Sequence, residues 1–532
     1  MKEGLRPRGR HCRYLVAVAL ASAGLVAGCG SSGDSDNAKD DSKSTDAKTS
    51  EKFALGVSYD LGNLDPHAGE DVSTQMLFHN IAQTLVEPDF EGNTPKTKPM
   101  LAKSFTQDDD TTWTFKLQDG VKFSNGEVFD AEAAKSSIER YLDPATQSAH
   151  ASFLKVKTMT VVDPTTLEIK TDGPSPDLTR ALYDVAMVPP KAVKDDPEGF
   201  TKKPIGTGPY VVSEATPDRL TMTINPDYWN KANATPRAKT ITVEPRPEAA
   251  TRVAAVQAGE VDVVNSVPLE SIEQLPAAPH VPANENLQLR LNATDGVFQD
   301  AKMREAVLIG TDTEKIRTSL YTDEHSRAPQ CQHAPPQAFG FNPDLQPAAI
   351  DTDKAKTLIK EAGYNGEKVT IIGAQGHYPK GDEAVQAIEG EWKELGLNVE
   401  LKILPTDAWI KPLFGEERGG ETVHKGHDAI IVGLSAFALT AIEPMQTAVD
   451  QGAQLETFPH DDNPEVQPLL DKAREELDPD KQEALLKELG EKICASNGFM
   501  FIANYDAIWG TKEGVDFKPR PDARVILDTP KS

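Results

Sequence analysis

The sequence predicts an α/β protein that folds as two lobes joined by a hinge. Two segments, 240–267 and 369–404, each have the pattern of a strand, a helix, a glycine and a second strand. Such a unit builds a parallel sheet with a right-handed crossover. The two units lie far apart in a chain of 532 residues, a length at which one hydrophobic core usually divides. We therefore expect each unit to belong to its own sheet.

Short strands and helices are expected ahead of the first unit. The pattern predicts, in order, a strand at 52–60, a helix at 73–86, a strand at 111–118, a helix at 131–142 and two strands within 160–170 around a proline turn. Apolar residues at helical spacing indicate the first helix. Alternation places Trp113, Phe115 and Leu117 on one face of a strand, and Asp130 is a plausible N-cap for the second helix.

Around the second unit the pattern predicts further elements and a hinge. They are a strand at 287–294, a helical pattern over 301–321, two helices at roughly 464–477 and 480–495, and a strand at 499–510. We expect extended crossovers to join the two lobes into a hinged molecule. The natural ligand site of such a hinged molecule is the cleft between the lobes, at the carboxyl ends of the strands.

The amino terminus, residues 1–28, has the pattern of a secretory signal peptide. Basic residues precede the apolar stretch 14–27, which is too short to span a bilayer comfortably. No arginine pair appears, which favours the general export route over the twin-arginine route. The segment Val26-Ala27-Gly28-Cys29 resembles a bacterial lipobox, in which the cysteine is joined to diacylglycerol after cleavage. We expect Cys29 to be a lipid anchor.

Residues 29–50 are expected to form a disordered tether between this anchor and the folded body, because they contain almost nothing to bury. The formal net charge of −27 becomes more negative once the basic signal peptide is removed. That charge repels nucleic acid and anionic lipid. We therefore expect no nucleic-acid partner and membrane contact through the lipid anchor only.

Two cysteines remain in the folded body, Cys331 and Cys494. In an exported protein they can form one disulfide. Two separate buried thiols are the alternative, because the sequence does not give their distance. His424 and His427, in HKGH, suggest a metal but lack a third ligand at recognisable spacing, so we expect a solvated loop there. We predict no metal site and no cofactor.

Five blocks of sequence follow one another between Phe53 and about Tyr505. They are WTFKLQDGVKFSNGEVFDAEAAKSSIERYLDP, PIGTGPYVVSEATPDRLTMTINPDYWN, ATRVAAVQAGEVDVVNSVP, LRLNATDGVFQDAKMREAVLIGTDTEKI and AKTLIKEAGYNG. Together, and in this order, they resemble the signature blocks of the extracellular solute-binding proteins of family 5, the dipeptide and oligopeptide type. One block could arise by chance, whereas five in order identify the chain as similar to members of that family.

The resemblance implies a two-lobed, type II periplasmic-binding-protein-like fold with an additional small subdomain in lobe one. It places domain I at 51–288 and 503–532, the inserted subdomain at about 80–200, and domain II at 289–502. It implies a monomer that captures a peptide or other small solute in the interdomain cleft and delivers it to ABC permease subunits. With its anchor, the protein would lie at the outer face of the cytoplasmic membrane.

Peptide-binding members of the family hold the peptide amino group with an aspartate in a segment that resembles SADYPDP. Here the segment is SAFALTAIEP. Aligned on Ser435 and Ala436, the aspartate position falls on Phe437, and Glu443-Pro444 resembles the later acid–proline pair. A phenyl ring cannot pair with an ammonium charge, but it offers a cation–π face or a stacking plane. The ligand class therefore stays open among peptide, oligosaccharide and metal chelate.

Four more residues are candidates for the cleft. Tyr59 and Asp60 end the first strand, and Asn504 and Tyr505 lie on the return crossover. A tyrosine at a strand end is more often a core or rim residue than a ligand contact. Trp409 is expected in the core of domain II.

Two other functions fit parts of the sequence. A surface receptor that senses a peptide or oligosaccharide without importing it would use the same lobe closure. A secreted hydrolase would use Ser435, which follows a strand as in a nucleophile elbow, but the second glycine of that motif is replaced by Phe437. The sequence has no GK-ending phosphate loop and no HExxH. We therefore predict a binding protein, not an enzyme, without catalytic residues.

Overall fold

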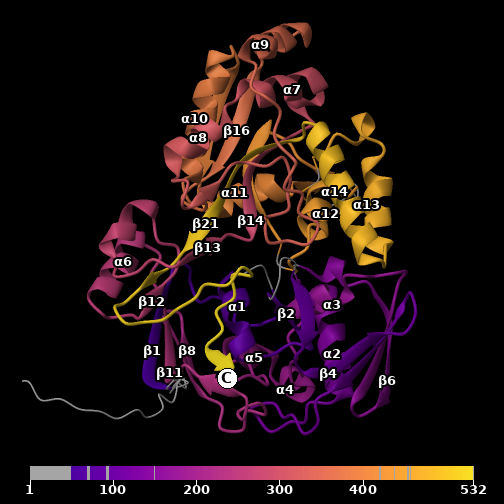
Figure 1. Ribbon diagram of the computed structural model, residues 1–532, viewed down its shortest axis with the longest axis vertical. Coiled ribbons are helices and arrows are strands. Elements are labelled where there is room, and N and C mark those ends of the chain that lie inside the picture. Colours follow the sequence, from indigo (N-terminus) through magenta and orange to yellow (C-terminus); the bar gives the residue numbers. More distant parts are fainter. Residues whose placement is uncertain are drawn as a thin grey trace, which may run out of the picture. The chain divides into compact units, whose positions relative to one another are not determined.

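The computed structural model (Figure 1) describes most of the folded body. The described residues are 49–68, 72–90, 95–148, 150–418, 421–436, 438–451, 455 and 457–530. The predicted signal peptide, the anchor Cys29 and nearly all of the predicted tether lie outside them, as does Phe437. Across the residues that are described, no helix has both the length and the apolar character needed to cross a bilayer.

A six-stranded sheet forms the core of the first lobe, in the order β22–β12–β1–β11–β9–β8. Its strands are β1 (Ser50–Val57), β8 (Tyr210–Thr216), β9 (Arg219–Ile224), β11 (Ala238–Pro245), β12 (Val263–Val264) and β22 (Gly510–Thr511). Strand β1 is parallel to both β11 and β12, which α6 (Ala249–Gln257) connects. The first predicted strand–helix–strand unit is confirmed, with β1 inserted between its strands.

A four-stranded antiparallel sheet builds a separate core within the first lobe, in the order β4–β5–β7–β6. Its strands are β4 (Ala102–Gln107), β5 (Thr112–Leu117), β6 (Val156–Asp163) and β7 (Thr166–Thr171). Trp113, Phe115 and Leu117 are buried in one cluster with residues of α2 (Ala131–Leu142), as the alternation predicts. Asp130 caps α2, because its side chain accepts a hydrogen bond from the Ala133 amide.

Smaller elements complete the first lobe. They are α1 (Val72–Leu77), the paired strands β2 (Val86–Asp89) and β3 (Lys96–Pro99), α3 (Leu178–Ala181), α4 (Pro190–Asp195), α5 (Pro197–Lys202), and the paired strands β10 (Ala234–Pro236) and β23 (Asp528–Pro530). The carboxyl-terminal segment also enters this lobe, since Val525 and Leu527 are buried in the core of the six-stranded sheet. The Asn80 side chain holds both: its amide donates to the Val525 carbonyl (2.6 Å) and its oxygen accepts from the Leu527 amide (2.7 Å).

The second lobe has a seven-stranded sheet, in the order β13–β21–β14–β20–β16–β17, with β15 also paired to β21. Its strands are β13 (His280–Pro282), β14 (Glu285–Leu291), β15 (Ser326–Arg327), β16 (Lys368–Ala374), β17 (Asn398–Leu404), β20 (Ala429–Ser435) and β21 (Phe499–Ile508). Strands β16 and β17 are parallel and are joined through α10 (Gly381–Glu394). This confirms the second predicted unit.

The remaining elements of the second lobe lie around this sheet (Figure 1). They are α7 (Ala301–Gly310), α8 (Thr313–Leu320), α9 (Thr352–Glu361), α11 (Thr406–Phe414), α12 (Ile442–Val449), α13 (Val466–Glu475), α14 (Pro479–Ala495) and the paired strands β18 (Glu416–Arg418) and β19 (Glu421–Val423). The predicted helical pattern over 301–321 is divided into α7 and α8. The helix is interrupted at Asp312, because the Asp312 side chain accepts from the Lys315 amide and so caps the start of α8.

The helix predicted over 73–86 is shorter than expected. Helix α1 ends at Leu77, a single 3-10 turn follows to Asn80, and the chain then leaves the helix. The reason lies in the Gly206-Thr207-Gly208 turn: the Gly208 amide donates to the Ile81 carbonyl (2.8 Å). Backbone hydrogen bonds to a distant segment thus replace those that would have continued the helix.

One strand passes from the sheet of the second lobe to that of the first. Strand β21 pairs with β13, β14 and β15, and the chain then enters β22, which pairs with β12. The Val267 amide also donates to the Ile508 carbonyl (3.0 Å) at this crossing. Residues 499–511 therefore physically connect the two sheets.

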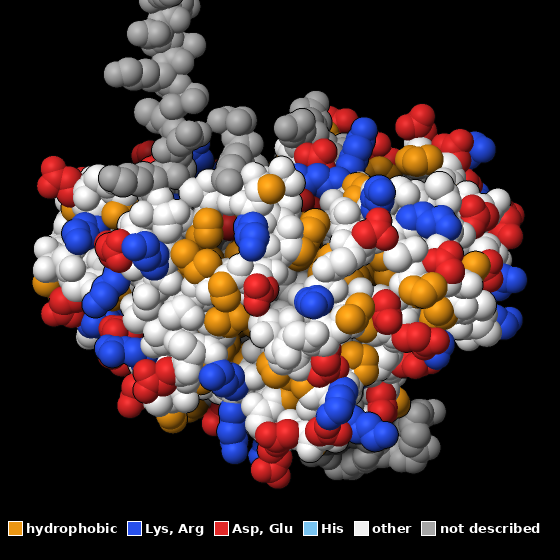
Figure 2. All heavy atoms as spheres, turned by 90° about the horizontal axis from the view of Figure 1, so that it is seen from below, with side chains coloured by type: hydrophobic (Ala, Val, Ile, Leu, Met, Phe, Trp, Pro, Cys, Tyr) orange, Lys and Arg blue, Asp and Glu red, His pale blue; other side chains and the backbone are white. Residues whose placement is uncertain are grey.

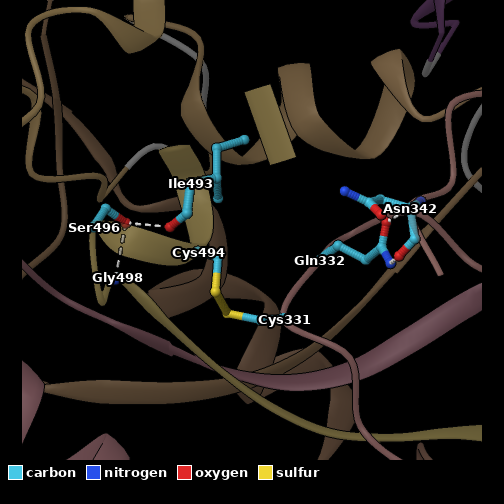
Figure 3. The surroundings of a disulfide bond; sticks show 7 residues. All are labelled: Cys331, Gln332, Asn342, Ile493, Cys494, Ser496 and Gly498. Atoms are coloured by element: carbon cyan, nitrogen blue, oxygen red, sulfur yellow. Dashed lines mark hydrogen bonds between the residues drawn. A yellow bond between two sulfur atoms is a disulfide. The ribbon is translucent and has the colours of Figure 1, made fainter. Parts of the chain in front are cut away.

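A disulfide joins Cys331 to Cys494 at the carboxyl-terminal end of α14 (Figure 3). The sulfur atoms are 2.09 Å apart, and the two cysteines are 163 positions apart in the sequence. Nearby, the Gln332 side chain donates to the Asn342 carbonyl and accepts from the Asn342 amide (2.9 Å). Of the two alternatives that the sequence leaves open, the structure has the bonded one.

Acidic and basic side chains are interspersed on the face of the molecule drawn in Figure 2. The formal charge of −27 is therefore not gathered into one acidic field there. Continuous basic surfaces are what nucleic-acid binding requires, and this face does not present one.

Candidate functional site

The segment after β20 is fixed by backbone hydrogen bonds at the point where the second lobe meets the subdomain. The Ala436 amide donates to the Asn284 carbonyl (2.8 Å), and the Ala441 amide donates to the Phe339 carbonyl (2.7 Å). Leu439 has a φ of +55°, in the left-handed region that a side chain rarely adopts. Its carbonyl accepts from the Phe339 amide (2.9 Å). Backbone hydrogen bonds thus hold Ala436, Leu439 and Ala441 in place before α12 begins.

A narrow crevice separates this segment from the subdomain. It is lined by Pro88, Pro95, Lys96, Thr97, Arg180, Tyr183, Ala438 and Leu439. Its volume is about 10 Å³, which is room for a single water molecule. Ala438 and Leu439 belong to the second lobe and the other lining residues to the first. A solute larger than water can enter only if the two sides separate.

Glu443 lies in the first turn of α12 and is 3% exposed. Its carboxylate accepts a hydrogen bond from the Ala438 amide (2.8 Å). Burial raises the pKa of Glu443 to about 7, and the charge of Asp184 adds to this effect while His150 opposes it. An acid with this pKa changes charge near neutral pH.

Three charged side chains of the first lobe face this acid. His150 Nδ1 lies 3.0 Å from Asp184 Oδ2, and Arg524 Nη2 donates to Asp184 Oδ1 at 2.5 Å. Burial alone would lower the pKa of His150, but the hydrogen bond to Asp184 outweighs burial and raises it. Burial would raise the pKa of Asp184, but the His150 hydrogen bond and the Arg524 charge lower it. Asp184 is therefore ionised and paired.

At this junction Glu443 is the carboxylate that makes no salt bridge among the described residues. One oxygen or nitrogen atom from each of His150, Asp184 and Glu443 lies within 4.8 Å of the others. Asp184 already has two cationic partners, whereas Glu443 makes no salt bridge within the described chain. An ammonium group or a metal ion placed here would meet a desolvated carboxylate, which binds a cation more strongly than an exposed one.

Three of the residues predicted from the sequence meet around a second acid, the half-buried Glu285. The Tyr505 hydroxyl and the Ser435 hydroxyl (3.4 Å) both donate to its carboxylate, and the Asn504 side chain donates to its backbone carbonyl (3.0 Å). Burial raises the pKa of Glu285, although the hydrogen bonds from Tyr505 and Ser435 oppose this. The antiparallel register of β14 and β20 places Glu285 opposite Ser435.

The other predicted residues lie elsewhere. The Tyr59 hydroxyl donates to the Met76 sulfur (3.0 Å), and its ring packs against the core of the first lobe. Asp60 is exposed. Ala436 is fully buried, so it can contribute shape and backbone groups only. Cys29 and Phe437 lie outside the described residues, and their roles stay predictions.

The expectation of a solvated loop at His424 and His427 is wrong. The two residues are 2% and 4% exposed, because the Asn292 side chain donates to both of their carbonyls (2.9 and 3.2 Å) and holds the loop against β14. Burial, with the charge of Arg290, lowers the pKa of His427 to about 4. Trp409 is in the core as predicted, and its indole donates to the Ile431 carbonyl (3.1 Å).

Ser435 has none of the surroundings of a catalytic nucleophile. Its hydroxyl donates to the Glu285 carboxylate, and within the described chain no histidine is hydrogen-bonded to it. A serine becomes nucleophilic when an adjacent base accepts its proton and is itself oriented by a third group. The Glu285 carboxylate, which also accepts from the Tyr505 hydroxyl and lies 3.4 Å from the serine oxygen, does not supply the short contact to a base that this arrangement needs.

The sequence pattern does not predict four residues of these two sites: His150, Asp184, Arg524 and Glu285. His150 lies in the loop QSAHASF and Arg524 in the tail PDARV, neither of which has a recognisable motif. Asp184 and Arg524 are 340 positions apart. Glu285 gave no such signal either, because it lies two positions before the strand predicted at 287–294.

A sequence model described as "Bacterial extracellular solute-binding proteins, family 5 Middle" matches residues 96–453. The glutathione-binding protein GsiB of Escherichia coli (strain K12) is 26% identical over 405 residues, which are 74% of this chain and 74% of GsiB. Relatives with the same name occur in several Shigella species.

Solved structures show the same fold. The periplasmic binding protein DppA from Helicobacter pylori, in complex with the peptide STSA, has a TM-score of 0.74 and 22% identity and covers 90% of this chain and 97% of its own. OppA from Haemophilus influenzae, in complex with RPPGFSPFR, has a TM-score of 0.75 and 20% identity, with coverages of 90% and 98%. The similarity extends over both lobes, so the type II periplasmic-binding-protein fold is shown.

Proposed function

Since the chain belongs to the bacterial extracellular solute-binding proteins of family 5, we propose that it is the substrate-binding lipoprotein of an ABC importer and takes up a small zwitterionic solute, such as a short peptide, between its lobes. The single observation that carries this proposal is Glu443, a buried carboxylate at the lobe junction that makes no salt bridge among the described residues. It is not an enzyme, because capture and release require no chemistry on the solute.

Glu443 is suited to hold the ammonium group of such a solute. Desolvation makes its ionised form costly, as its raised pKa of about 7 indicates. A ligand ammonium within hydrogen-bond reach would offset that cost by charge pairing. Glu443 would thus do the work that the family's peptide-binding members assign to an aspartate, the position that falls on Phe437 in this chain.

Two cations near the crevice suit the opposite end of a zwitterion. Lys96 of β3 and Arg180 of α3 both line it. Arg180 pairs with Asp177 (2.6 Å) and lies over the Phe339 ring of the second lobe (4.6 Å to the ring centre), so its guanidinium is already placed at the junction. A carboxylate entering there would meet positive charge and a preorganised fork of donors.

Capture requires the lobes to part, because the crevice has room for only one water molecule. Few polar contacts oppose parting: the Gln482 side chain donates to Asp177 (2.8 Å), and Lys380 lies 3.3 Å from Glu270. A surface ion pair such as Lys380–Glu270 contributes about 0–1 kcal/mol, and a single hydrogen bond such as that of Gln482 contributes about 1 kcal/mol. A ligand that touches both lobes therefore has enough differential affinity to favour the closed form, which a permease would recognise.

Replacing Glu443 with glutamine is expected to weaken binding of a zwitterionic peptide. Removing one partner of a buried charge pair costs roughly 3 kcal/mol, which is about a hundredfold in Kd. Wild-type affinity should fall about tenfold from about pH 8 to about pH 6 as Glu443 takes up a proton, and protonation of His150 acts in the same direction. The Glu443→Gln chain should lose most of this pH dependence. Isothermal titration calorimetry over a panel of peptides measures both effects.

The matched control is Glu488→Gln, an exposed acid on α14, which should bind like wild type. Native mass spectrometry of the purified chain, with thermal shifts for peptides, oligosaccharides and chelated nickel, selects the panel. Unchanged peptide affinity in Glu443→Gln would reject Glu443 as the ammonium site. Binding of oligosaccharides alone would reject the zwitterionic solute class.

The lipid anchor is a separate part of the proposal. A Cys29→Ser chain should be released from membranes, because no acyl chain can then be attached, while its affinity for the solute stays unchanged. Fractionation of cells that express either chain, followed by immunoblotting, measures the distribution. Membrane association that persists in the Cys29→Ser chain would contradict lipidation at Cys29.

A further inference from the structure

A second group of metal-ligating side chains lies on the strands that cross between the lobes. It consists of His280, His325 and Asp506, whose ligand atoms all lie within 4.8 Å of one another. His280 Nδ1 is 2.6 Å from Asp506 Oδ2, and the two imidazole rings are 4.5 Å apart, edge to face. None of these residues takes part in the junction around Glu443.

Backbone pairing fixes the three residues relative to one another. Strand β21, which carries Asp506, pairs with β13 on one side and β15 on the other. His280 begins β13, and His325 immediately precedes β15. The Asp506 amide donates to the His325 carbonyl (2.9 Å). The three side chains therefore project from two paired strands and from the residue that precedes a third, and backbone hydrogen bonds fix their spacing.

His325 supplies the observation that points to a ligand. The residue is 7% exposed, and its buried Nδ1 has no hydrogen-bond partner among the residues that the structure describes. A buried imidazole nitrogen without a partner costs free energy comparable to a lost hydrogen bond. Beside it lie a second imidazole, partly open to solvent, and a fully buried carboxylate. Two imidazoles and one carboxylate form a common donor set for Zn²⁺ sites with an open fourth position.

We propose that His280, His325 and Asp506 bind one divalent transition-metal ion of the Zn²⁺ class, with water as a further ligand. The ion would link β13, where the chain has left the first lobe, to β21, which leads back to that lobe. This departs from the absence of a metal site that the sequence predicts. The first and the last of the three ligands, His280 and Asp506, are 226 positions apart in the sequence, so no short sequence motif contains all three.

Arg327 competes with the ion for Asp506. Its guanidinium pairs with Oδ1 of the carboxylate, while His280 contacts Oδ2. The Arg327 side chain is 40% exposed, so it can move into solvent when an ion binds. Replacing Arg327 with glutamine removes the competing charge and should tighten metal binding, whereas a purely structural role for this cluster would give no such gain.

The test is Zn²⁺ titration of the purified, chelator-treated chain by calorimetry, with Co²⁺ absorption as the optical probe of the ligands. Wild type should bind one ion, and Arg327→Gln should bind it more tightly. Loss of a second-sphere partner already weakens metal affinity about 10–100-fold, so His280→Ala or His325→Ala should lose at least about 100-fold. His377→Ala, which removes an exposed histidine, should bind like wild type.

Two results would overturn the metal site. One is a wild-type chain with native circular dichroism that takes up no Zn²⁺ or Co²⁺. The other is one-to-one binding that survives in both His280→Ala and His325→Ala. Because His280 is partly exposed, His280→Ala is expected to fold. Its metal affinity can therefore be measured even if His325→Ala does not fold. Loss of Zn²⁺ binding in Glu443→Gln alone would move the ion to the lobe junction and reject the site on the crossing strands.

Discussion

Replacing Gly208 with alanine is expected to destabilise the first lobe by about 4 kcal/mol or more, which is at the upper end of the range for single substitutions. A Cβ at this position would lie 2.4 Å from the Asn80 carbonyl oxygen and 2.8 Å from the Ile81 carbonyl carbon. Both obstacles are backbone atoms, so no side-chain rotation relieves the contact. Gly206 is equally confined, with the Ile81 oxygen 2.2 Å from its Cβ position.

Urea unfolding followed by circular dichroism measures the effect, and Gly390→Ala is the matched control. Gly390 lies inside α10 with no atom within 4 Å of its Cβ position. Alanine there should stabilise the chain by up to about 1 kcal/mol, because glycine is the poorer helix former. A Gly208→Ala chain with the unfolding midpoint of wild type would show that residues 80–82 can move away, and it would refute the tight packing of this turn.

Loss of the Cys331–Cys494 disulfide is expected to have an effect of similar size. The bond closes a loop across 163 positions, and the chain-entropy model gives about 5 kcal/mol for a loop of this length. The double replacement Cys331→Ser/Cys494→Ser should therefore lower the Tm of the second lobe by roughly 10 °C. Differential scanning calorimetry resolves this transition, since both cysteines belong to the second lobe or pack against its core.

The reductant dithiothreitol separates the bond from the side-chain changes. It should lower the Tm of wild type toward that of the double variant and leave the double variant unchanged. Equal melting of oxidised wild type and the double variant would contradict a stabilising disulfide. Structural disulfides form and persist mainly in oxidising compartments, so a stabilising bond here would fit a protein that folds outside the cytoplasm.

Much of the fold could be predicted because its signals are local. The strand–helix–strand units at 240–267 and 369–404 are predicted from the spacing of their apolar residues and from the glycine after each helix. Both units are present in the structure. The helix expected over 73–86 ends early because Gly208, more than a hundred positions later, supplies the hydrogen bonds that stop it. No window around Leu77 contains that information.

The candidate site was less accessible from the sequence for the same reason. Asn504 and Tyr505 could be placed because they lie on a predicted strand, and Ser435 because it follows one. The structure brings the three residues together. Their meeting point, Glu285, depends on the register of β14 against its neighbours. The His150, Asp184 and Arg524 cluster unites a loop, a 3-10 turn and the tail of the chain. Burial of His424 and His427 depends on Asn292, which lies about 130 positions earlier.

The return of the last residues to the first lobe has a consequence for the order in which the protein matures. Asn80 and Tyr210 hydrogen-bond to backbone groups at Val525 and Leu527, so the amino-terminal half cannot finish its interior until the opposite end of the polypeptide arrives. A chain threaded through a membrane channel from its amino end would cross with that half still incomplete. Late completion of this kind suits translocation, because a narrow pore admits only polypeptide that has not yet become compact.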